Sequence, residues 1–400
     1  MAKFLLSCII AICCASLSIA MDSASNSYSQ PTTSEILVGK GPGWECKYTT
    51  MPPYMYNCGC TRISELRLAD VNFFDNTVTD LWVPCNAKLP SYNASVFDGL
   101  PSFIRQIKIW DCFEEEVGKE VLYGLINIDS LDLVNMLSLF VNRVLDHWIT
   151  EPLAPVRLDP ELFASVPQLR KLNLRWLFMD TFPEALYHKI NGQAPLQNML
   201  ELDLSWNRIP DVKSEYFSNM IKLNVLDISF NHIHNLSDSL LMLRNLQRLH
   251  IKGNHIESLD GSPFKTLREL STLVLSQMRP IINITLPGHV GHKYPQRGAL
   301  RFIHPSSFVG LWNLKELQID INSIELIQNG TFDPLIKLEQ LNLSVGLIST
   351  IEEDGFRGLQ SLSSLDLSYN NLSCIGNSVF ENLPALLKLN LEGNYPREPL

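Results

Sequence analysis

Apolar residues recur along this chain in the pattern Leu-x-x-Leu-x-Leu-x-x-Asn, most regularly in the second half. In the stretch 223–233, Leu226 and Ile228 alternate with polar residues and Asn231 follows. Such alternation predicts a short strand with one face inward. The asparagines of six such segments are Asn207, Asn231, Asn254, Asn322, Asn370 and Asn394. The steps 207→231 and 370→394 are both 24 residues, and 322→370 is 48, so the pattern has a fixed period.

A period of roughly 20–29 residues with this pattern predicts a leucine-rich repeat solenoid. The fold class is therefore α/β, a horseshoe with short parallel strands on its concave face and a disulfide cap at its N-terminal end. We expect each asparagine amide to bond backbone groups that the turn after the strand leaves unpaired. Phenylalanines placed ten residues after the asparagine position should stack in a column on the convex side: Phe217, Phe264, Phe332, Phe356 and Phe380.

The first half of the chain keeps the apolar frame less regularly. Ile104/Ile107/Ile109 and Ile128/Leu131/Leu133 lie 24 residues apart, and Ile63/Leu66/Leu68 could form the first strand. The organisation we predict is a signal peptide at 1–20, a flexible polar tail at 21–44, and a cysteine cap with the first degenerate repeat at 45–100. Degenerate repeats follow at 101–168 and regular repeats at 169–400.

The N-terminus indicates export. A basic Lys3, an apolar run over 4–15 and small residues at Ser18 and Ala20 are typical of a secretory signal peptide cleaved after Ala20. No other stretch is long and apolar enough to cross a bilayer. Six Asn-x-Ser/Thr sequons fit an extracellular location: Asn93, Asn235, Asn283, Asn329, Asn342 and Asn371.

Six cysteines remain after removal of the signal peptide, and an even number in a secreted chain suggests disulfides. Cys46, Cys58, Cys60 and Cys85 precede the repeats and are interpreted as a disulfide-locked cap over the open end of the solenoid. Their pairing stays open, because four cysteines allow three pairings. Their wide spacing argues against zinc. Cys112 is expected to be a buried thiol, and Cys374 has no evident partner.

At this point the chain resembles the extracellular leucine-rich repeat superfamily of animals, which includes Toll and Toll-like receptor ectodomains, chaoptin-like adhesion proteins and Slit-type guidance proteins. The resemblance covers about residues 46–400 and implies a protein that binds other molecules and is not an enzyme. The last repeat, Leu386/Leu389/Leu391/Asn394, is followed by no cysteine cap, so we expect a fragment of a longer receptor or adhesion protein. A membrane attachment would lie in a C-terminal segment absent from this chain.

Two regions are candidate partner-binding sites. The residues just before the asparagine position in successive repeats include Trp176, Trp206 and Phe230, which could form an aromatic ladder, and aromatic residues dominate interface hot spots. The alternative is that these rings only pack on one another. The second region is an inserted loop near 279–299, where His289 and His292 lack a third metal ligand nearby in sequence.

Net charge and sequence motifs limit the classes of function that this chain can have. The net charge of −10 and the lack of a basic tract argue against nucleic acid. No catalytic motif and no cofactor motif is present. We expect an extracellular protein ligand or a cell-surface protein as partner, with homo- or heterodimer formation open. The leading hypothesis is the ligand-binding ectodomain of a Toll-like receptor. A chaoptin- or connectin-type adhesion protein and a secreted immune or matrix factor are the alternatives.

Overall fold

The computed structural model describes residues 35–135, 154–276 and 300–394, apart from residues 51, 191, 193, 260, 374, 375 and 377. The predicted signal peptide, the loop 279–299 with its histidines, Asn283 and Cys374 lie outside the described residues. The chain divides into two compact units, Met1–Glu35 and Ile36–Leu400. The description below concerns the second unit.

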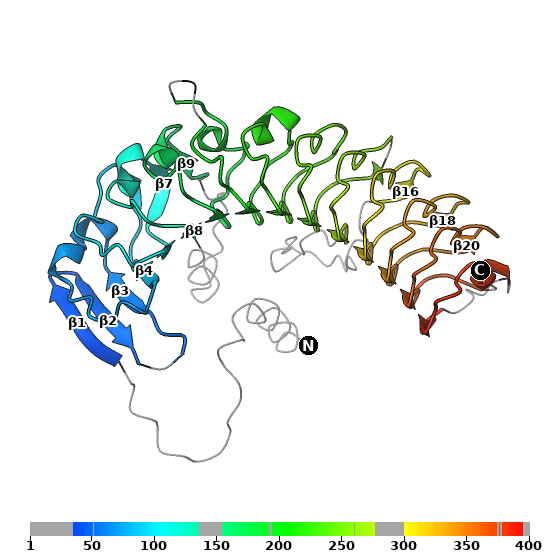
Figure 1. The fold of residues 1–400 in the computed structure, drawn as a ribbon, viewed down its shortest axis with the longest axis horizontal. Coiled ribbons are helices and arrows are strands. Elements are labelled where there is room, and N and C mark those ends of the chain that lie inside the picture. Colours follow the sequence, from blue (N-terminus) through cyan, green and yellow to red (C-terminus); the bar gives the residue numbers. More distant parts are fainter. Residues whose placement is uncertain are drawn as a thin grey trace, which may run out of the picture. The chain divides into compact units, whose positions relative to one another are not determined.

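One sheet of short strands runs through this unit along its inner edge (Figure 1). β2 and β3 are antiparallel, and from β3 onward each strand pairs in parallel with the next. In spatial order the strands are β1 (Glu35–Gly41), β2 (Trp44–Thr49), β3 (Tyr56–Cys60), β4 (Asp80–Pro84), β6 (Gln106–Trp110), β8 (Ser130–Val134), β10 (Lys171–Asn173), β11 (Glu201–Asp203), β12 (Val225–Asp227), β13 (Arg248–His250), β15 (Thr272–Val274), β17 (Glu316–Gln318), β19 (Gln340–Asn342), β21 (Ser364–Asp366) and β22 (Lys388–Asn390).

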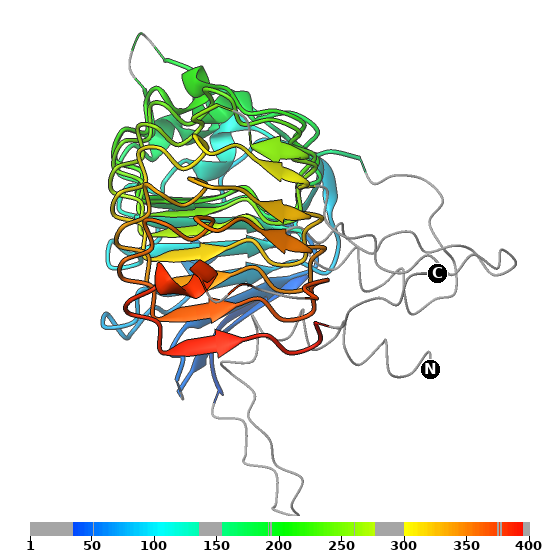
Figure 2. The ribbon, with the colours of Figure 1, turned by 90° about the vertical axis from the view of Figure 1, so that its right-hand side faces the viewer.

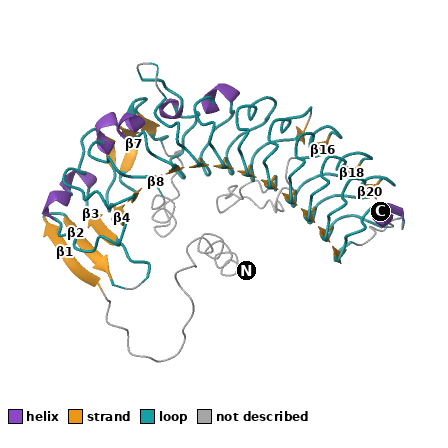
Figure 3. Ribbon diagram, in the orientation of Figure 1, coloured by secondary structure: helices purple, strands orange, loops and turns teal. Residues whose placement is uncertain are grey.

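The outer side of the coil carries little regular structure (Figures 2 and 3). Its small parallel sheets are β5 (Leu89–Tyr92), β7 (Phe113–Val117) and β9 (Arg157–Leu158), then β14 (Ser258–Leu259) with β16 (Phe302–Ile303), and β18 (Leu326–Ile327) with β20 (Thr350–Ile351). Helices in the described residues are single turns: 3-10 turns η1 (Ile63–Glu65), η2 (Leu68–Asp70), η3 (Lys119–Leu122), η4 (Leu162–Ser165), η5 (Glu184–Leu186) and η6 (Ser214–Phe217), and helix α3 (Ser378–Glu381). The predicted solenoid is confirmed, with less helix than an α/β label suggests.

The core is a stack of equivalent residues from successive repeats. Leu202, Leu226 and Leu249 pair in register on neighbouring strands and are at most 1% exposed. The predicted phenylalanine column is present in part: Phe264, Phe308, Phe332 and Phe356 stack, and the centroids of Phe308 and Phe356 lie 5.8 and 6.1 Å from that of Phe332. Phe217 is buried but lies edge-on to Phe182, and Phe380 packs against the core. Phe308 was not anticipated, because the insertion before it shifts its place in the repeat.

The asparagine side chains bond backbone groups beside the turn, as predicted, and in doing so they also link a repeat to the one before it. Asn231 Nδ2 donates to Leu204 O in the preceding repeat at 3.0 Å and to Ile228 O in its own repeat at 3.1 Å. Its Oδ1 accepts from Ile209 N at 3.0 Å. Asn207, Asn254, Asn370 and Asn394 make the same set of bonds. One side chain thus satisfies backbone groups on two coils.

Replacing Asn231 with alanine should destabilise the solenoid. The change leaves the buried Ile209 N–H without its acceptor, and a buried unsatisfied group costs about 1–3 kcal/mol. Leu204 O and Ile228 O each lose one of two donors, because Asn207 and Asn254 also donate to them. Thermal unfolding of the purified variant measures the loss. Asn245→Ala is the matched control, because Asn245 is exposed and makes a single bond, to Ile221 O. Equal melting temperatures for the two variants would contradict the bridging role of Asn231.

The N-terminal region differs from the prediction in its strands. Ile63, Leu66 and Leu68 are buried, but they belong to the η1 and η2 turns or flank them and do not form a strand. The strand of this repeat is β4, whose Leu81 and Val83 face the core. Within the expected tail 21–44, residues from Glu35 onward form β1 and the start of β2. The spacing of Ile63, Leu66 and Leu68 suggested a strand, but a tight turn can bury residues with the same spacing.

Pairing further along resolves the two irregular stretches. β8 pairs directly with β10, and β15 pairs directly with β17, so no other described strand of this sheet lies between the members of either pair. Among the described residues, no helix has the length and apolar character needed to span a membrane.

The cysteine pairing is a correction to the predicted cap. Cys46 is bonded to Cys58 across the antiparallel pair β2–β3, as a cap disulfide. Cys85, however, is bonded to Cys112, which was expected to be a free thiol, and Cys60 is the buried free thiol. Cys60 and Cys112 lie on either side of Cys85 in the stack, so either could have paired with it. Burial, and then the nearby charge of Glu65, raises the pKa of the Cys60 thiol to about 12.

Peptide mapping of the purified protein under non-reducing conditions should therefore recover two linked pairs, Cys46–Cys58 and Cys85–Cys112. Cys60 should react with an alkylating reagent only after unfolding, because its thiol is buried and protonated. Recovery of a Cys60–Cys85 link would contradict this pairing.

Candidate functional site

The side chains that the strands turn away from the core form rows across the concave face. We name two rows by their place on the strand. The central row contains Asn173, Asp203, Asp227, His250, Val274, Gln318, Asn342 and Asp366. The first row contains Lys171, Glu201, Val225, Arg248, Thr272, Glu316, Gln340 and Ser364.

The acidic residues of the central row have a structural role, because they accept hydrogen bonds from the backbone of the turn after the strand. Asp203 Oδ1 accepts from Ser205 N at 2.9 Å, and Asp227 Oδ1 accepts from Ser229 N at 2.8 Å. The amide oxygen of Asn342 makes the same bond to Ser344 N, at 3.0 Å. This side chain to backbone bond fixes the turn that follows each strand. The presence of these acidic residues on the concave face therefore does not by itself indicate a ligand-binding site.

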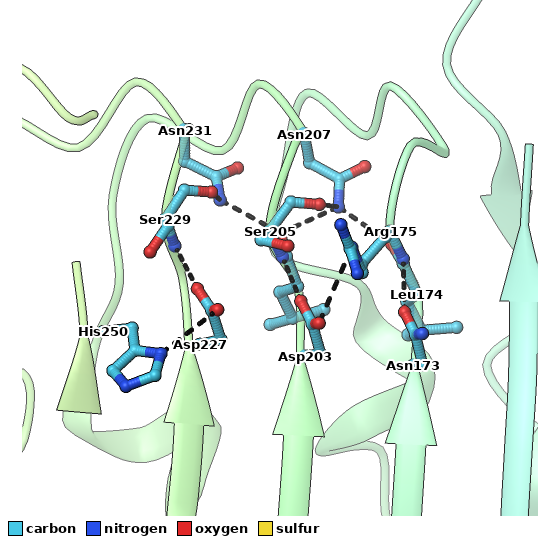
Figure 4. A network of polar contacts seen from close by, with 11 residues as sticks. Asn173, Leu174, Arg175, Asp203, Ser205, Asn207, Asp227, Ser229, Asn231 and His250 are labelled. Atoms are coloured by element: carbon cyan, nitrogen blue, oxygen red, sulfur yellow. Dashed lines mark hydrogen bonds and ion pairs between the residues drawn. The ribbon is translucent and has the colours of Figure 1, made fainter. Parts of the chain in front are cut away.

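Arg175 and His250 flank the neighbouring carboxylates of Asp203 and Asp227 (Figure 4). Arg175 Nε lies 3.7 Å from Asp203 Oδ2, and His250 Nδ1 lies 3.5 Å from Asp227 Oδ2. Burial, and then the neighbouring charge of Asp227, raises the pKa of Asp203 to about 6. Burial also opposes ionisation of Asp227, but hydrogen bonds from His250 and Ser229 outweigh it and lower the pKa of Asp227. Asp203 is thus the carboxylate that takes up a proton first.

The Asp203→Asn variant should show a pH-dependent gain in stability. Because the pKa of Asp203 in the folded state, about 6, exceeds its ordinary value of 3.8, the folded state holds the proton more tightly between these values. The contribution of this group to stability therefore falls as pH rises through 6. Asparagine keeps the turn bond, as Asn173 and Asn342 do. The melting temperature of the variant, relative to the wild type, should be higher at pH 8 than at pH 4. A difference that does not change with pH would contradict the raised pKa.

The predicted aromatic ladder exists. The Trp176 and Trp206 rings stack with centroids 4.2 Å apart, and the Trp206 and Phe230 rings with centroids 4.0 Å apart. All three residues have positive φ, between 54° and 62°, so the ladder forms where the chain turns after each strand. The next position is Gly253, where a Cβ would come within 2.4 Å of the Phe230 ring. The rings thus pack on one another and on the backbone, yet each remains half-exposed.

A shallow hollow of about 490 Å³ adjoins the ladder. Trp206 and Phe230 border it on one side, and Thr272, Glu316 and Gln318 on the other. Three basic side chains from one strand and its end also line it: Arg248, His250 and Lys252. The site therefore combines aromatic surface with concentrated charge. The described residues contain no cluster of histidines, cysteines and carboxylates suited to holding a metal.

Comparison with known proteins agrees with this architecture. A leucine rich repeat family model matches residues 197–256, 296–345 and 337–395. These residues of the chain are leucine-rich repeats. The fold is similar to that of Toll in a solved Toll–Spatzle complex from Drosophila, with a TM-score of 0.53 and 17% identity over 92% of this chain and 50% of that one. A leucine-rich repeat protein of Leptospira interrogans also matches, with a TM-score of 0.50 and 17% identity over 76% of this chain and 70% of that one.

Similar sequences occur in several leucine-rich repeat proteins. Osteomodulin of Bos taurus is 26% identical over 183 residues, which span 42% of this chain and 39% of that protein. Chaoptin of Drosophila melanogaster is 30% identical over 123 residues, 30% of this chain and 9% of that protein. Toll-like receptor 9 of Sus scrofa is 26% identical over 194 residues, 43% of this chain and 18% of that protein. The chain thus spans less than half the length of these relatives.

The described sequons of this chain lie at different places on the coil. Asn93, Asn235 and Asn329 are exposed, and Asn371 is half-buried. Asn342 lies on β19 in the central row, between Gln318 and Asp366. The strand register therefore places Asn342 on the concave face. Whether glycans occupy these sites stays a prediction.

Sequence reasoning missed the basic residues of the hollow. Arg248, His250 and Lys252 alternate with the buried Leu249 and Ile251, so their shared face was readable from the repeat pattern. The bulky aromatic residues drew attention to the neighbouring column instead. The hollow itself depends on how side chains of successive repeats fill space, which the repeat period does not specify.

Proposed function

We propose that this chain is a non-enzymatic extracellular recognition domain, the ligand-binding ectodomain of a Toll-like cell-surface receptor. Its concave face binds a protein ligand at the aromatic ladder formed by Trp176, Trp206 and Phe230. The observation that carries the proposal is the half-exposed ladder at the border of a charged hollow. Stacked rings offer a large rigid contact surface that loses little conformational entropy on binding.

The position of Asn342 supports a site toward the N-terminal repeats. A glycan at this sequon would project from the central row and cover the concave face around β19. Protein contacts would then concentrate around the ladder, several strands away in the sheet. Similarity to Toll and Toll-like receptor 9 is consistent with a receptor ectodomain.

Truncation of Trp206 to alanine should weaken partner binding by more than about 1 kcal/mol, the loss typical of an interface hot spot. Surface plasmon resonance against the protein partner measures it. The matched control is Tyr369→Ala, because Tyr369 has the same place in its repeat and a similar positive φ of 55°. Tyr369 lies beyond the predicted Asn342 glycan, so its truncation should leave affinity unchanged.

A double Trp206→Ala, Phe230→Ala variant that is secreted normally and binds the partner at full affinity would contradict the ladder site. The inserted loop near 279–299 would then be the next region to test. Mass spectrometry that finds Asn342 unmodified would separately remove the masking argument and reopen the whole concave face.

The alternative function is adhesion. The similarity to chaoptin favours a protein that binds in trans to another cell. A soluble secreted immune or matrix factor is the third possibility. The coding sequence after Leu400 separates the three. A cysteine cap, a membrane helix and a signalling domain would select the receptor, a lipid-anchor signal would select the adhesion protein, and a stop codon would select the secreted factor.

A further inference from the structure

Strand β13 directs a line of basic side chains into the hollow. Arg248 and His250 lie on the strand and Lys252 follows it, each two residues after the last. The intervening Leu249 and Ile251 are fully buried, so the three basic residues share the concave face. All three line the hollow beside Trp206 and Phe230.

The positive charge of β13 is not neutralised within the described structure. His250 pairs with Asp227, but Arg248 and Lys252 form no side-chain hydrogen bond or ion pair with the residues that the structure describes. In the first row, Arg248 lies between Val225 and Thr272, neither of which carries a charge. Elsewhere on the same face, Lys171 Nζ lies 3.0 Å from Glu201 Oε1, on the neighbouring strand. β13 therefore offers two cations that lack the acidic neighbour other repeats provide.

We propose that Arg248 and Lys252 bind acidic side chains of the protein ligand, next to an aromatic or apolar side chain held by Trp206 and Phe230. This inference rests on the proposed function and names the chemistry that the concave face selects. A carboxylate that enters the hollow replaces water around the cations with charge-assisted hydrogen bonds, which are stronger than neutral ones. Arg248 offers a planar fork suited to bidentate contact with a carboxylate, and Lys252 a point charge.

The surrounding charges favour an acidic protein segment over a nucleic acid. The basic zone is one strand wide: Asp203 and Asp227 lie on one side of it and Glu316 on the other. One or two carboxylates fit between these acids. The successive phosphates of a nucleic acid would extend over the acids, and the net charge of −10 adds to the repulsion.

The test uses fluorescein-labelled peptides and fluorescence anisotropy on the secreted protein. The probe is Glu-Tyr-Glu-Glu-Tyr-Glu, and its neutral counterpart is Gln-Tyr-Gln-Gln-Tyr-Gln. The wild type should bind the acidic peptide at least about tenfold more tightly than the neutral one, about 1.4 kcal/mol. The Arg248→Ser, Lys252→Ser variant should lose that difference. Serine is tolerated at these places, since Ser364 lies in the first row and Ser229 at the position equivalent to Lys252.

A charge-matched control separates the site from the overall charge. Arg244→Ser, Arg301→Ser removes two exposed cations outside the concave strands and should keep the preference for the acidic peptide. Equal binding of the acidic peptide by the wild type and the Arg248→Ser, Lys252→Ser variant would overturn the proposal. Binding of a thymidine oligonucleotide of equal charge that is tighter and lost in the same variant would overturn it in favour of a phosphate ligand.

The same set of variants shows whether a negative result contradicts this inference or the proposed function. If Arg248→Ser, Lys252→Ser leaves the acidic peptide bound while Trp206→Ala weakens the native partner, only the acidic subsite is overturned. If the peptide preference is lost in Arg248→Ser, Lys252→Ser while Trp206→Ala has no effect on the partner, the acidic subsite is supported and the ladder is overturned.

Discussion

The structure depends on one repeated interaction, the bridge that an asparagine amide makes between two coils of backbone. In the repeats of Asn207, Asn231, Asn254, Asn370 and Asn394, the amide donates to a carbonyl of its own coil and to one of the preceding coil, while its oxygen accepts from a backbone N–H of that preceding coil. Asn322 makes only the donor bonds. A buried turn without these bonds would leave several polar groups unsatisfied. The leucine stack supplies most of the buried apolar area, but it is the amide that sets one coil against the next in a fixed register.

A fixed register has a functional consequence. Because neighbouring strands pair in register, the outward side chains of successive repeats lie in rows. Neighbouring residues in a row then contact one another and form a continuous surface. The stacked rings of Trp176, Trp206 and Phe230 and the neighbouring carboxylates of Asp203 and Asp227 both arise in this way. The scaffold leaves the identity of these outward residues free, so one fold can present different recognition chemistry.

The parts of the structure that follow the period were predictable from sequence. The bonding of Asn231 to backbone groups beside its turn, the core position of Leu226 and the neighbouring placement of Trp206 and Phe230 all follow from the phase of the repeat. That Asn231 also joins two coils was not predicted. The errors lie where the period breaks. Ile63 and Leu66 belong to a turn with strand-like spacing. Cys85 has a cysteine on each side of it in the stack, and sequence spacing does not say which one it joins. The hollow lined by Arg248 and Lys252 emerges only when the side chains of several repeats are placed together.

Hydrogen exchange of individual backbone amides tests the bridging account most directly. The amides of Ile209, Ile233 and Ile348 each lie after a strand, outside the sheet ladder, and donate to the asparagine oxygen of the following repeat at 3.0, 3.1 and 3.0 Å. The account predicts that these amides exchange as slowly as those of the core strands, because opening them requires separation of two coils. Exchange at the rate of the exposed outer turns would show that the asparagine bridges do not hold the repeats together.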